Sequence, residues 1–491
     1  MKEFSIKALA QIIKAKFDTR YSMLDARISR HTSDERQATG DDFFTGVSTD
    51  SRTVKACDCF FALAGENFDG HNYMADAFAK GAVCAVVNKN RVTDAAQRGI
   101  VLEVDDTLKA LGDFAGEYHR QAGYKVVAIT GSAGKTTTRQ IAYHVLSQYY
   151  GVYQSPKNFN NNIGLPLTLL GADPEDKIVI AELGTNHPGE IAYLTRVAQP
   201  DIAVITNVHP AHLEGLGDIQ TVAQEKLSIS EGLQPDGILI INADLVNRLN
   251  CQLPVTNYRV LTFGTSDDCD YKISNIKYES FSSSFTMDKT QVELPLPGPG
   301  NVENAAAAWA VCSRFGLTIE NFSQAVKTLK TVSMRMEVIQ IGTLTVINDC
   351  YNANPASMKN ALEVLKNLCV EKKCRSVFIC GDMAELGQQS ETLHAELGAA
   401  IVKAGVQVLL TVGKLSKITA EAAEKAADYD IQIKCFDDTI STCNNLQQLI
   451  KDYDIILVKG SRIAKLELII EKFKTHDFVT GFVTLKDEKK R

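Results

Sequence analysis

Residues 125–150, KVVAITGSAGKTTTRQIAYHVLSQYY, decide how the middle of this 491-residue chain folds. A short β-branched run leads into a loop with two glycines, and a helical pattern follows. Gly131 and Gly134 let the backbone turn tightly, so that successive N–H groups converge on phosphate oxygens, while the helix N-terminus adds a partial positive charge. The stretch therefore predicts a strand, a nucleotide-binding loop and a helix of a parallel α/β sheet.

Residues 131–137 form this loop, which we name the phosphate loop. Lys135 is placed to bridge the outer phosphates, and the hydroxyl of Thr136 to ligate Mg²⁺. Ile129 stands where the longer Walker pattern has its first glycine, so a shorter loop is implied. An ordinary strand-to-helix turn could share the GxxGKT string, but the flanking strand and helix favour phosphate binding. The residues expected at the phosphates are Gly131, Ser132, Ala133, Gly134, Lys135, Thr136 and Thr137.

The same pattern of short strands and intervening helices extends on both sides of the phosphate loop. Four runs without alternation indicate strands that are buried on both faces, as in a parallel sheet covered by helices. These runs are KVVAIT (125–130), KIVIAEL (177–183), DIAVITN (201–207) and DGILIIN (236–242). The last third repeats the alternation from TVINDC to DIILVKGS and predicts a second, doubly wound sheet.

The first hundred residues predict a smaller α/β domain. CFFALAG (59–65) and AVCAVVN (82–88) are its apolar runs, and the polar stretch 25–45 reads as a loop or a partly disordered insert. With 45% hydrophobic residues, a chain of this length is expected to form two to four domains. We predict an α/β protein with three domains, at 1–106, 107–331 and 332–491.

Composition excludes several classes of protein. With 52 Lys+Arg against 59 Asp+Glu the net charge is −7, so the chain lacks the basic excess of a nucleic-acid binder. The twelve cysteines have no metal-ligand spacing and suggest reduced thiols. A lysine-interrupted N-terminus does not resemble a signal peptide, and no run is long enough for a membrane span. We expect a soluble, cytoplasmic protein.

Three further residues are candidates for metal binding, each with a plain alternative. Glu182 ends a predicted strand, where a carboxylate could ligate Mg²⁺ or equally cap a helix or pair with a cation. His212 lies in a loop after the next strand, and a histidine there is more often a structural hydrogen-bonder than a ligand. Lys226 lies in a helical stretch and by itself indicates a solvated surface lysine.

Ten ordered motifs between about residues 46 and 465 resemble those of the Mur ligase family. Motifs in the right order are far more specific than any one of them alone. They are STDSR (48–52), FFALAGENFDGH (60–71), TGSAGKTTT (130–138), NFNNNIGLPLTLL (158–170), AELGTNHPGEI (181–191), NVHPAHLEGLG (207–217), QEKLSI (224–229), NDCYNANPASM (348–358), GDMAELG (381–387) and VKGSR (458–462). The resemblance implies an N-terminal uridine-nucleotide-binding domain, a central P-loop ATPase-like domain and a C-terminal Rossmann-like ligase domain.

The resemblance also implies roles at the ATP and metal sites. Lys135 and Thr136 keep their phosphate and Mg²⁺ roles, with Glu182 and His212 as metal ligands. Lys226 matches a lysine that reacts with CO₂ to form a carbamate, an anionic oxygen donor for a second Mg²⁺. Among the residues implied as catalytic or ATP-binding are also Arg335 at the γ-phosphate and Asn304 and Asp349 at the adenine and ribose.

Substrate residues follow from the resemblance as well. Those implied are Ser48, Asp50, Ser51 and Arg52 at the uridine diphosphate, Asn160 and Asn161 near the metals, and Asn352, Asn354, Ser461 and Arg462 at the peptides. One departure is Gly300-Asn301, where the family usually has His-Asn, so the role of that histidine is missing or supplied elsewhere.

Among family members, the motifs most resemble those that add D-alanyl-D-alanine to UDP-N-acetylmuramoyl-tripeptide. That resemblance implies an acyl phosphate made from ATP, two Mg²⁺ ions, and a site completed by closure of the C-terminal domain. A monomer is expected, although the oligomeric state stays open, as does the third residue of the tripeptide, meso-diaminopimelate or L-lysine. The alternatives are a sister ligase that adds the third-position diamino acid, a folylpolyglutamate synthetase, and a nucleotide-dependent switch without ligase activity.

Overall fold

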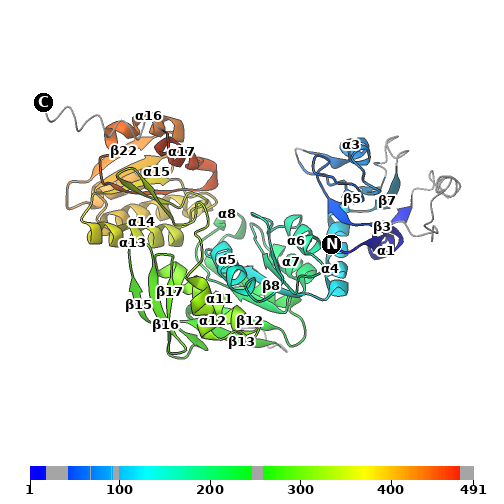
Figure 1. The fold of residues 1–491 in the computed structure, drawn as a ribbon. Helices are drawn as coiled ribbons and strands as arrows, with labels where there is room; N and C mark the ends of the chain where they lie inside the picture. The colour runs from blue at the N-terminus through cyan, green and yellow to red at the C-terminus, as the bar shows by residue number, and fades with distance from the viewer. Residues whose placement is uncertain (18–42, 67, 90, 92–98, 246–257, 476–491) are drawn as a thin grey trace.

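A computed structural model of the chain describes residues 1–17, 43–66, 68–89, 91, 99–245 and 258–475. Three α/β bodies follow one another along the chain, and the central body lies between the other two (Figure 1). The predicted α/β class with three domains is confirmed. Residues 25–42 of the polar stretch lie outside the described residues. Among the described helices, none is long and apolar enough to cross a membrane.

The central body is built on a seven-stranded sheet in the order β14-β13-β12-β11-β8-β10-β9, and all its pairings are parallel. Its predicted strands are confirmed, and β8 lies at their centre between β10 and β11. The strands are β8 (Lys125–Thr130), β9 (Val152–Gln154), β10 (Ile178–Glu182), β11 (Ile202–Ile205), β12 (Ile238–Asn242), β13 (Arg259–Gly264) and β14 (Tyr271–Lys272).

Helices cover both faces of this sheet. On one face α5 (Lys135–Leu146) packs against the alanine-rich α11 (Pro299–Ser313), and small side chains allow the two helices a close approach. The other face carries α4 (Thr107–Ala122), α6 (Gly164–Gly171) and α7 (Glu190–Ala198). The remaining elements are α8 (Leu213–Leu216), α9 (Ile219–Leu227), the 3-10 turn η4 (Ser228–Gly232) and α12 (Ile319–Val326).

A three-stranded antiparallel sheet extends the central body, and the sequence analysis did not predict it. Its strands are β15 (Ser274–Tyr278), β16 (Ser283–Met287) and β17 (Thr290–Leu294). Asp288 and Lys289 join the last two strands with φ values of 47° and 67°. A two-residue turn with both φ angles positive matches the twist of a hairpin, but neither residue is the glycine that would have signalled it.

The C-terminal body holds a six-stranded sheet in the order β18-β19-β23-β20-β21-β22. Five of its strands are parallel, as predicted, and β18 adds an antiparallel edge. The strands are β18 (Glu337–Ile341), β19 (Leu344–Asn348), β20 (Ser376–Gly381), β21 (Val408–Val412), β22 (Gln432–Phe436) and β23 (Ile455–Lys459). The helices are α13 (Pro355–Lys372), η5 (Gly387–Gln389), α14 (Ser390–Lys403), α15 (Ser416–Ala426), α16 (Thr439–Leu449), η6 (Arg462–Ala464) and α17 (Glu467–Phe473).

The N-terminal body has a five-stranded sheet in the order β2-β7-β6-β5-β4, with a short β1-β3 pair beside it. Its two predicted apolar runs form β5 and β6. The elements are β1 (Phe4–Ser5), α1 (Ile6–Ile12), β2 (Lys16–Phe17), β3 (Phe43–Phe44), β4 (Gly46–Ser48), β5 (Asp58–Phe61), η2 (Gly70–Tyr73), α3 (Met74–Ala79), β6 (Cys84–Asn88) and β7 (Ile100–Val104).

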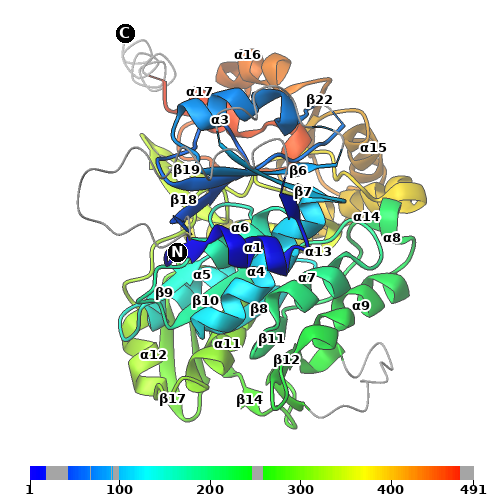
Figure 2. The same cartoon turned by 90° about the vertical axis from the view of Figure 1, so that its right-hand side faces the viewer.

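Helix α4 connects the N-terminal and central bodies, as Figure 2 shows. It begins after Asp106, whose carboxylate accepts a hydrogen bond from the backbone N–H of Leu108 at 2.8 Å. Its Phe114 ring lies 5.1 Å from the ring of Phe4. One cluster of buried apolar side chains includes Phe114 together with strands of both sheets. The two bodies therefore share a continuous core, and the domain boundaries at 106 and 331 stay predictions.

Candidate active site

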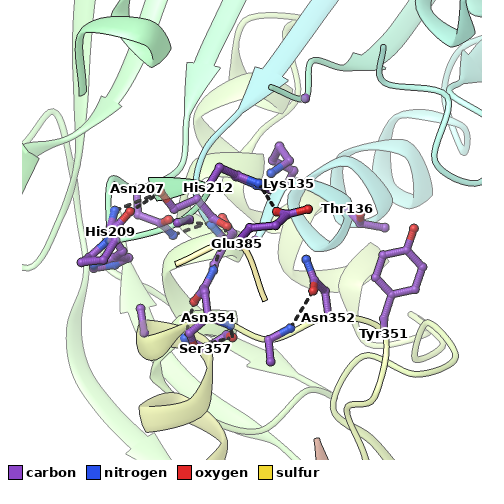
Figure 3. A pocket seen from close by; sticks show the side chains of 18 of the residues that line it. Lys135, Thr136, Asn207, His209, His212, Tyr351, Asn352, Asn354, Ser357 and Glu385 are labelled. Atoms are coloured by element: carbon purple, nitrogen blue, oxygen red, sulfur yellow. Dashed lines mark hydrogen bonds and ion pairs between the residues drawn. The ribbon is translucent and has the colours of Figure 1, made fainter. Parts of the chain in front are cut away.

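A cleft of about 1240 Å³ lies between the central and C-terminal bodies, and most of the predicted site residues line it. Figure 3 shows side chains from both bodies projecting into this space. The predicted residues that line it are Ser132, Ala133, Gly134, Lys135, Thr136, Thr137, Asn160, Asn161, Glu182, His212, Asn304, Arg335, Asp349, Asn352, Asn354 and Arg462.

The phosphate loop has a backbone that requires its glycines. Gly131 and Gly134 have φ values of 151° and 83°. A Cβ at Gly134 would lie 2.1 Å from Oδ1 of Asn304, and one at Gly131 would lie 1.9 Å from Oγ1 of Thr206. Since non-glycine residues adopt such φ values only at a cost and there is no room for a side chain, both positions require glycine.

The loop after β11 holds the phosphate loop in place. Asn207 accepts a hydrogen bond from the backbone N–H of Ala133 at 2.9 Å through its Oδ1 atom. The hydroxyl of Thr206 donates to the carbonyl oxygen of Ala133 at 2.6 Å, and that of Ser132 donates to the carbonyl oxygen of His209 at 2.9 Å. These bonds fix the shape of the phosphate loop.

Lys135, the first residue of α5, lies close to several charged groups. Its ammonium donates a hydrogen bond to the carbonyl oxygen of Gly131 at 2.6 Å. The pKa of Lys135 is lowered to about 8, mainly by burial; the positive charge of Arg335 adds to this lowering, and the negative charge of Glu182 opposes it. A bound polyphosphate would favour the charged form, because a nearby anion stabilises an ammonium.

Glu182, at the end of β10, is buried beside the phosphate loop with 3% of its surface exposed. Its Oε2 accepts a hydrogen bond from the hydroxyl of Thr136 at 3.2 Å, and its Oε1 lies 3.1 Å from Nε of Arg139. That Oε1 atom has no hydrogen bond within the described residues. A buried carboxylate oxygen with spare capacity, next to a hydroxyl, suits Mg²⁺, which prefers oxygen donors and keeps phosphates and waters as its other ligands.

Lys226 is buried in α9, with 1% of its surface exposed. The reading as a solvated surface lysine, drawn from its helical context alone, is therefore wrong. The pKa of Lys226 is lowered to about 7, mainly by burial; the positive charge of Lys135 adds to this lowering, and the adjacent Glu225 opposes it. An amine with this pKa is partly neutral near pH 7, and the neutral amine is the form that can react with CO₂. Its chemistry thus fits carbamate formation.

His212 immediately precedes the short helix α8 and contacts the C-terminal body. Its Nδ1 atom lies 2.5 Å from Oε2 of Glu385. The hydrogen bond to His212 holds the pKa of the Glu385 carboxyl below its usual range. Glu385 belongs to the GDMAELG motif, and no role was assigned to it from the sequence.

The C-terminal wall of the cleft brings positive charge to the phosphate loop. The guanidinium carbon of Arg335 lies 4.1 Å from the centre of the Tyr351 ring, and its charge lowers the pKa of Lys135. Behind it, Asp349 accepts a hydrogen bond from the Lys459 ammonium at 2.6 Å. Lys459 is 2% exposed and was missed by the sequence analysis, although it lies in the VKGSR motif.

Asn354 connects the two walls directly. Its Oδ1 caps α13 by accepting from the backbone N–H of Ser357 at 2.9 Å. Its Nδ2 donates to the carbonyl oxygen of Ser132 in the phosphate loop at 3.1 Å. The amide thus has a structural role in addition to the substrate role that the family resemblance implied, and the latter stays a prediction.

Several predicted residues lie outside the cleft lining. Lys226 and Ser461 are buried behind it, and Gly131 supports the phosphate loop. The STDSR residues lie in the N-terminal body, where the guanidinium of Arg52 hydrogen-bonds Asp50 at 2.7 Å and lowers the pKa of that carboxyl to about 2. Ser48, Asp50, Ser51 and Arg52 are therefore not brought together with the phosphate loop.

The unusual Gly300 lies at the start of α11 and also lines the cleft. Its backbone N–H donates to Oδ1 of Asn360 at 2.9 Å. The side chain of the neighbouring Asn301 bonds back to the segment before α11, because its Nδ2 donates to the carbonyl oxygen of Pro297 at 2.7 Å. The side-chain amide of Asn360, in α13, thus occupies the space beside Gly300.

The chain belongs to the Mur ligase family. Three family models match it in order along the chain: "Mur ligase family, catalytic domain" at residues 43–119, "Mur ligase middle domain" at 129–312, and "Mur ligase, glutamate ligase domain" at 334–462. Together these models cover most of the sequence.

Individual members of the family are similar to this chain over most of its length. The UDP-N-acetylmuramoyl-tripeptide–D-alanyl-D-alanine ligase of Bacillus subtilis is 37% identical over 87% of this chain and 92% of its own length. The MurF structure from Acinetobacter baumannii matches with a TM-score of 0.82 and 28% identity, over 97% of this chain and all of that one. MurF from Thermotoga maritima in complex with ADP matches with a TM-score of 0.77 and 28% identity, over 88% and 97% of the two chains.

Proposed function

We propose that this chain is the Mur ligase that joins D-alanyl-D-alanine to UDP-N-acetylmuramoyl-tripeptide. The reaction consumes ATP and yields ADP, phosphate and the pentapeptide precursor of peptidoglycan. The observation that carries this proposal is the cleft, in which a preformed phosphate loop faces Arg335 and Asp349 of another domain. The relatives of this activity match almost the whole chain, so all three domains of such a ligase are present.

ATP binds with its phosphates on the phosphate loop. The backbone N–H groups at the start of α5 and the Lys135 ammonium bind the phosphate oxygens. Asn304 and Asp349 line the same cleft from opposite walls and are proposed to hold the adenine and ribose. A related MurF structure contains ADP, which supports nucleotide binding by this chain.

A carboxylate does not form an amide directly, because oxide is a poor leaving group. ATP supplies a better leaving group, phosphate. The terminal carboxylate of the tripeptide attacks the γ-phosphorus, the bond to the β-phosphate oxygen breaks, and an acyl phosphate forms. The dipeptide amine then attacks the acyl carbon, loses a proton, and phosphate leaves. Lys135 and Arg335 approach the reacting anions from the two walls and neutralise their charge.

Two Mg²⁺ ions are proposed to contribute further positive charge at the phosphates. Thr136, Glu182 and His212 are the ligands, and Lys226 joins them as a carbamate derived from CO₂. The buried Oε1 of Glu182, which accepts no hydrogen bond from the described residues although it pairs with Arg139, and the depressed pKa of Lys226 support these roles. No cluster of three His, Cys, Asp or Glu side chains suited to a metal occurs in the part of the chain that the structure describes, so the ions require substrate oxygens as well.

The substrates span the molecule. Ser48, Asp50, Ser51 and Arg52 hold the uridine diphosphate end in the N-terminal domain, and Asn160 and Asn161 lie where the tripeptide enters the cleft. Asn352, Asn354, Ser461 and Arg462 face the peptides from domain 332–491. We further propose a monomer with domains at 1–106, 107–331 and 332–491. We also propose that it is cytoplasmic, since its nucleotide substrates are cytoplasmic.

A phosphate-release assay with ATP and Mg²⁺ tests the function. We expect release only when both UDP-N-acetylmuramoyl-tripeptide and D-alanyl-D-alanine are present. Release with neither peptide present would indicate the nucleotide-dependent switch and contradict the proposal. Release with the dipeptide form of the precursor and a free diamino acid would instead identify a sister ligase.

A further inference from the structure

The contact between His212 and Glu385 joins two domains at the edge of the cleft, as Figure 3 shows. His212 immediately precedes α8 of the central body, and Glu385 follows strand β20 of the C-terminal body. Their side chains meet at 2.5 Å between Nδ1 and Oε2. The proposed function gives Glu385 no role.

The backbones around this pair are docked as closely as the side chains. The N–H of Glu214 donates to the carbonyl oxygen of Glu385 at 3.0 Å. Gly387 follows with a φ of 53°, and a Cβ there would lie 3.1 Å from the Cα of Glu214. The two loops therefore pack closely, because a methyl group at position 387 would push the Glu214 backbone away.

Both members of the pair have left-handed backbones. The φ values are 53° at His212 and 62° at Glu385. Residues with a Cβ adopt this region at an energetic cost, so it persists where surrounding contacts hold it, and such residues gather at functional sites. Two such residues that face each other across a domain boundary indicate that the surrounding contacts hold this pair in one geometry.

The chemistry of the pair explains what this geometry achieves. A carboxylate at Nδ1 fixes the neutral imidazole as the tautomer with its proton on Nδ1, which leaves the lone pair on Nε2 free for a cation. We propose that Glu385 is a positioning residue that orients His212 for the divalent cation when the C-terminal domain docks. The inference rests on the proposed function only in taking His212 as a cation ligand.

Closure and metal binding are coupled as a result. With the domains apart, the ring of His212 loses its partner, and the cation site loses a fixed ligand. Docking of the C-terminal domain thus brings Arg335 to the phosphates and fixes a metal ligand in one movement. A cation bound before closure is held more weakly than one bound after it.

Direct titration of Mn²⁺ into the full-length protein with a non-hydrolysable ATP analogue tests this coupling. We expect Glu385→Ala to weaken Mn²⁺ binding about 10-fold, the usual cost of losing such a partner, with analogue affinity in the absence of metal unchanged. Glu385→Gln keeps an acceptor oxygen and should recover most of the loss. Glu391→Ala, at an exposed position of α14, is the matched control and should bind as the parent does.

A second titration in a His212→Ala background separates orientation from simple packing. There, Glu385→Ala should cause no further loss, because the ring on which it acts is absent. Unchanged Mn²⁺ affinity in the single Glu385→Ala variant, or an equal loss in both backgrounds, would overturn the inference. Since the titration uses no peptide substrate, its result is independent of whether the phosphate-release assay supports the ligase function.

Discussion

The central wall of the cleft and the C-terminal wall differ in what holds their polar side chains. On the central wall the phosphate loop is fixed by backbone φ values and by hydrogen bonds from the next strand's loop. On the opposite wall Arg335 rests on the face of Tyr351, and Asn354 and Glu385 reach across to the first wall. The first wall is therefore preformed, whereas the second acts through the relative position of two domains.

The largest effect is expected for Arg335, on the C-terminal wall of the cleft. Arg335→Ala should lower kcat about 10³-fold, as for other arginines at a transferring phosphoryl group, and leave the affinity for ATP nearly unchanged. Steady-state phosphate release and direct ATP titration measure the two quantities. Arg314→Ala, at an exposed position after α11, is the control. A variant with the parent rate would contradict closure of this wall on the nucleotide.

A change in the preformed wall should affect both binding and turnover. Lys135→Ala removes an ammonium from the phosphate loop and should lower kcat/KM for ATP about 10²–10³-fold, with weaker ATP binding as part of the loss. Lys125→Ala, which removes an exposed ion pair with Asp201 on the same sheet, should change little. If Lys135→Ala binds ATP as tightly as the parent, the two walls would not differ in their contribution to ATP binding.

Lys226 gives the third prediction, on stability. Its folded-state pKa of about 7 lies below the ordinary 10.5. The unfolded chain therefore binds this proton more readily, so folding is penalised as pH falls below 10.5, and the penalty is complete below about 7. In buffer without CO₂, Lys226→Met should raise the free energy of unfolding at pH 7 by roughly 2–4 kcal/mol.

Urea unfolding at pH 7 and pH 9.5 measures this effect. The gain should be smaller at the higher pH, where less of the penalty applies. Lys177→Met, at an exposed position, should show no such dependence on pH. A Lys226→Met protein that is less stable than the parent at pH 7 would show that the ammonium is well solvated in the fold.

The smallest effect separates the two roles of Asn354. Asn354→Ala removes the cap of α13 and should cost about 1 kcal/mol of unfolding free energy. Asn354→Asp keeps a capping oxygen but cannot donate to the carbonyl oxygen of Ser132, so stability should be retained while kcat falls a few-fold. Denaturant unfolding and phosphate release on the same pair of variants provide the comparison. Equal kcat in Asn354→Asp and the parent would limit this residue to capping.

The contrast between the walls also explains how far the sequence could predict the molecule. The phosphate loop is a local signal, because glycines, a lysine and a helix start lie within seven residues and their chemistry follows from that spacing. The parallel sheets follow from uninterrupted β-branched runs. By contrast, the antiparallel strands β15 to β18 have mixed burial, and the turn between β16 and β17 lacks a glycine, so no clear pattern predicts them.

Residues whose partners are distant in sequence have no local signal. Arg335 and Lys226 both resemble surface cations in their own segments, and only the family resemblance pointed to a role. Glu385 and Lys459 lie within quoted motifs but were given no role, since their partners are distant in sequence. Long-range charge pairing is set by the fold, so a single sequence does not reveal it.

The core shared by the N-terminal and central bodies through α4 has a consequence for which precursors fit. Because apolar side chains from both bodies pack into one cluster, the span from STDSR to the phosphate loop is set before any ligand arrives. With the uridine end anchored at one extremity, as proposed, only a stem of the right reach delivers its carboxylate to the other. The pair of domains that shares this core then sets the length of peptide that fits, and the C-terminal domain need not set it again.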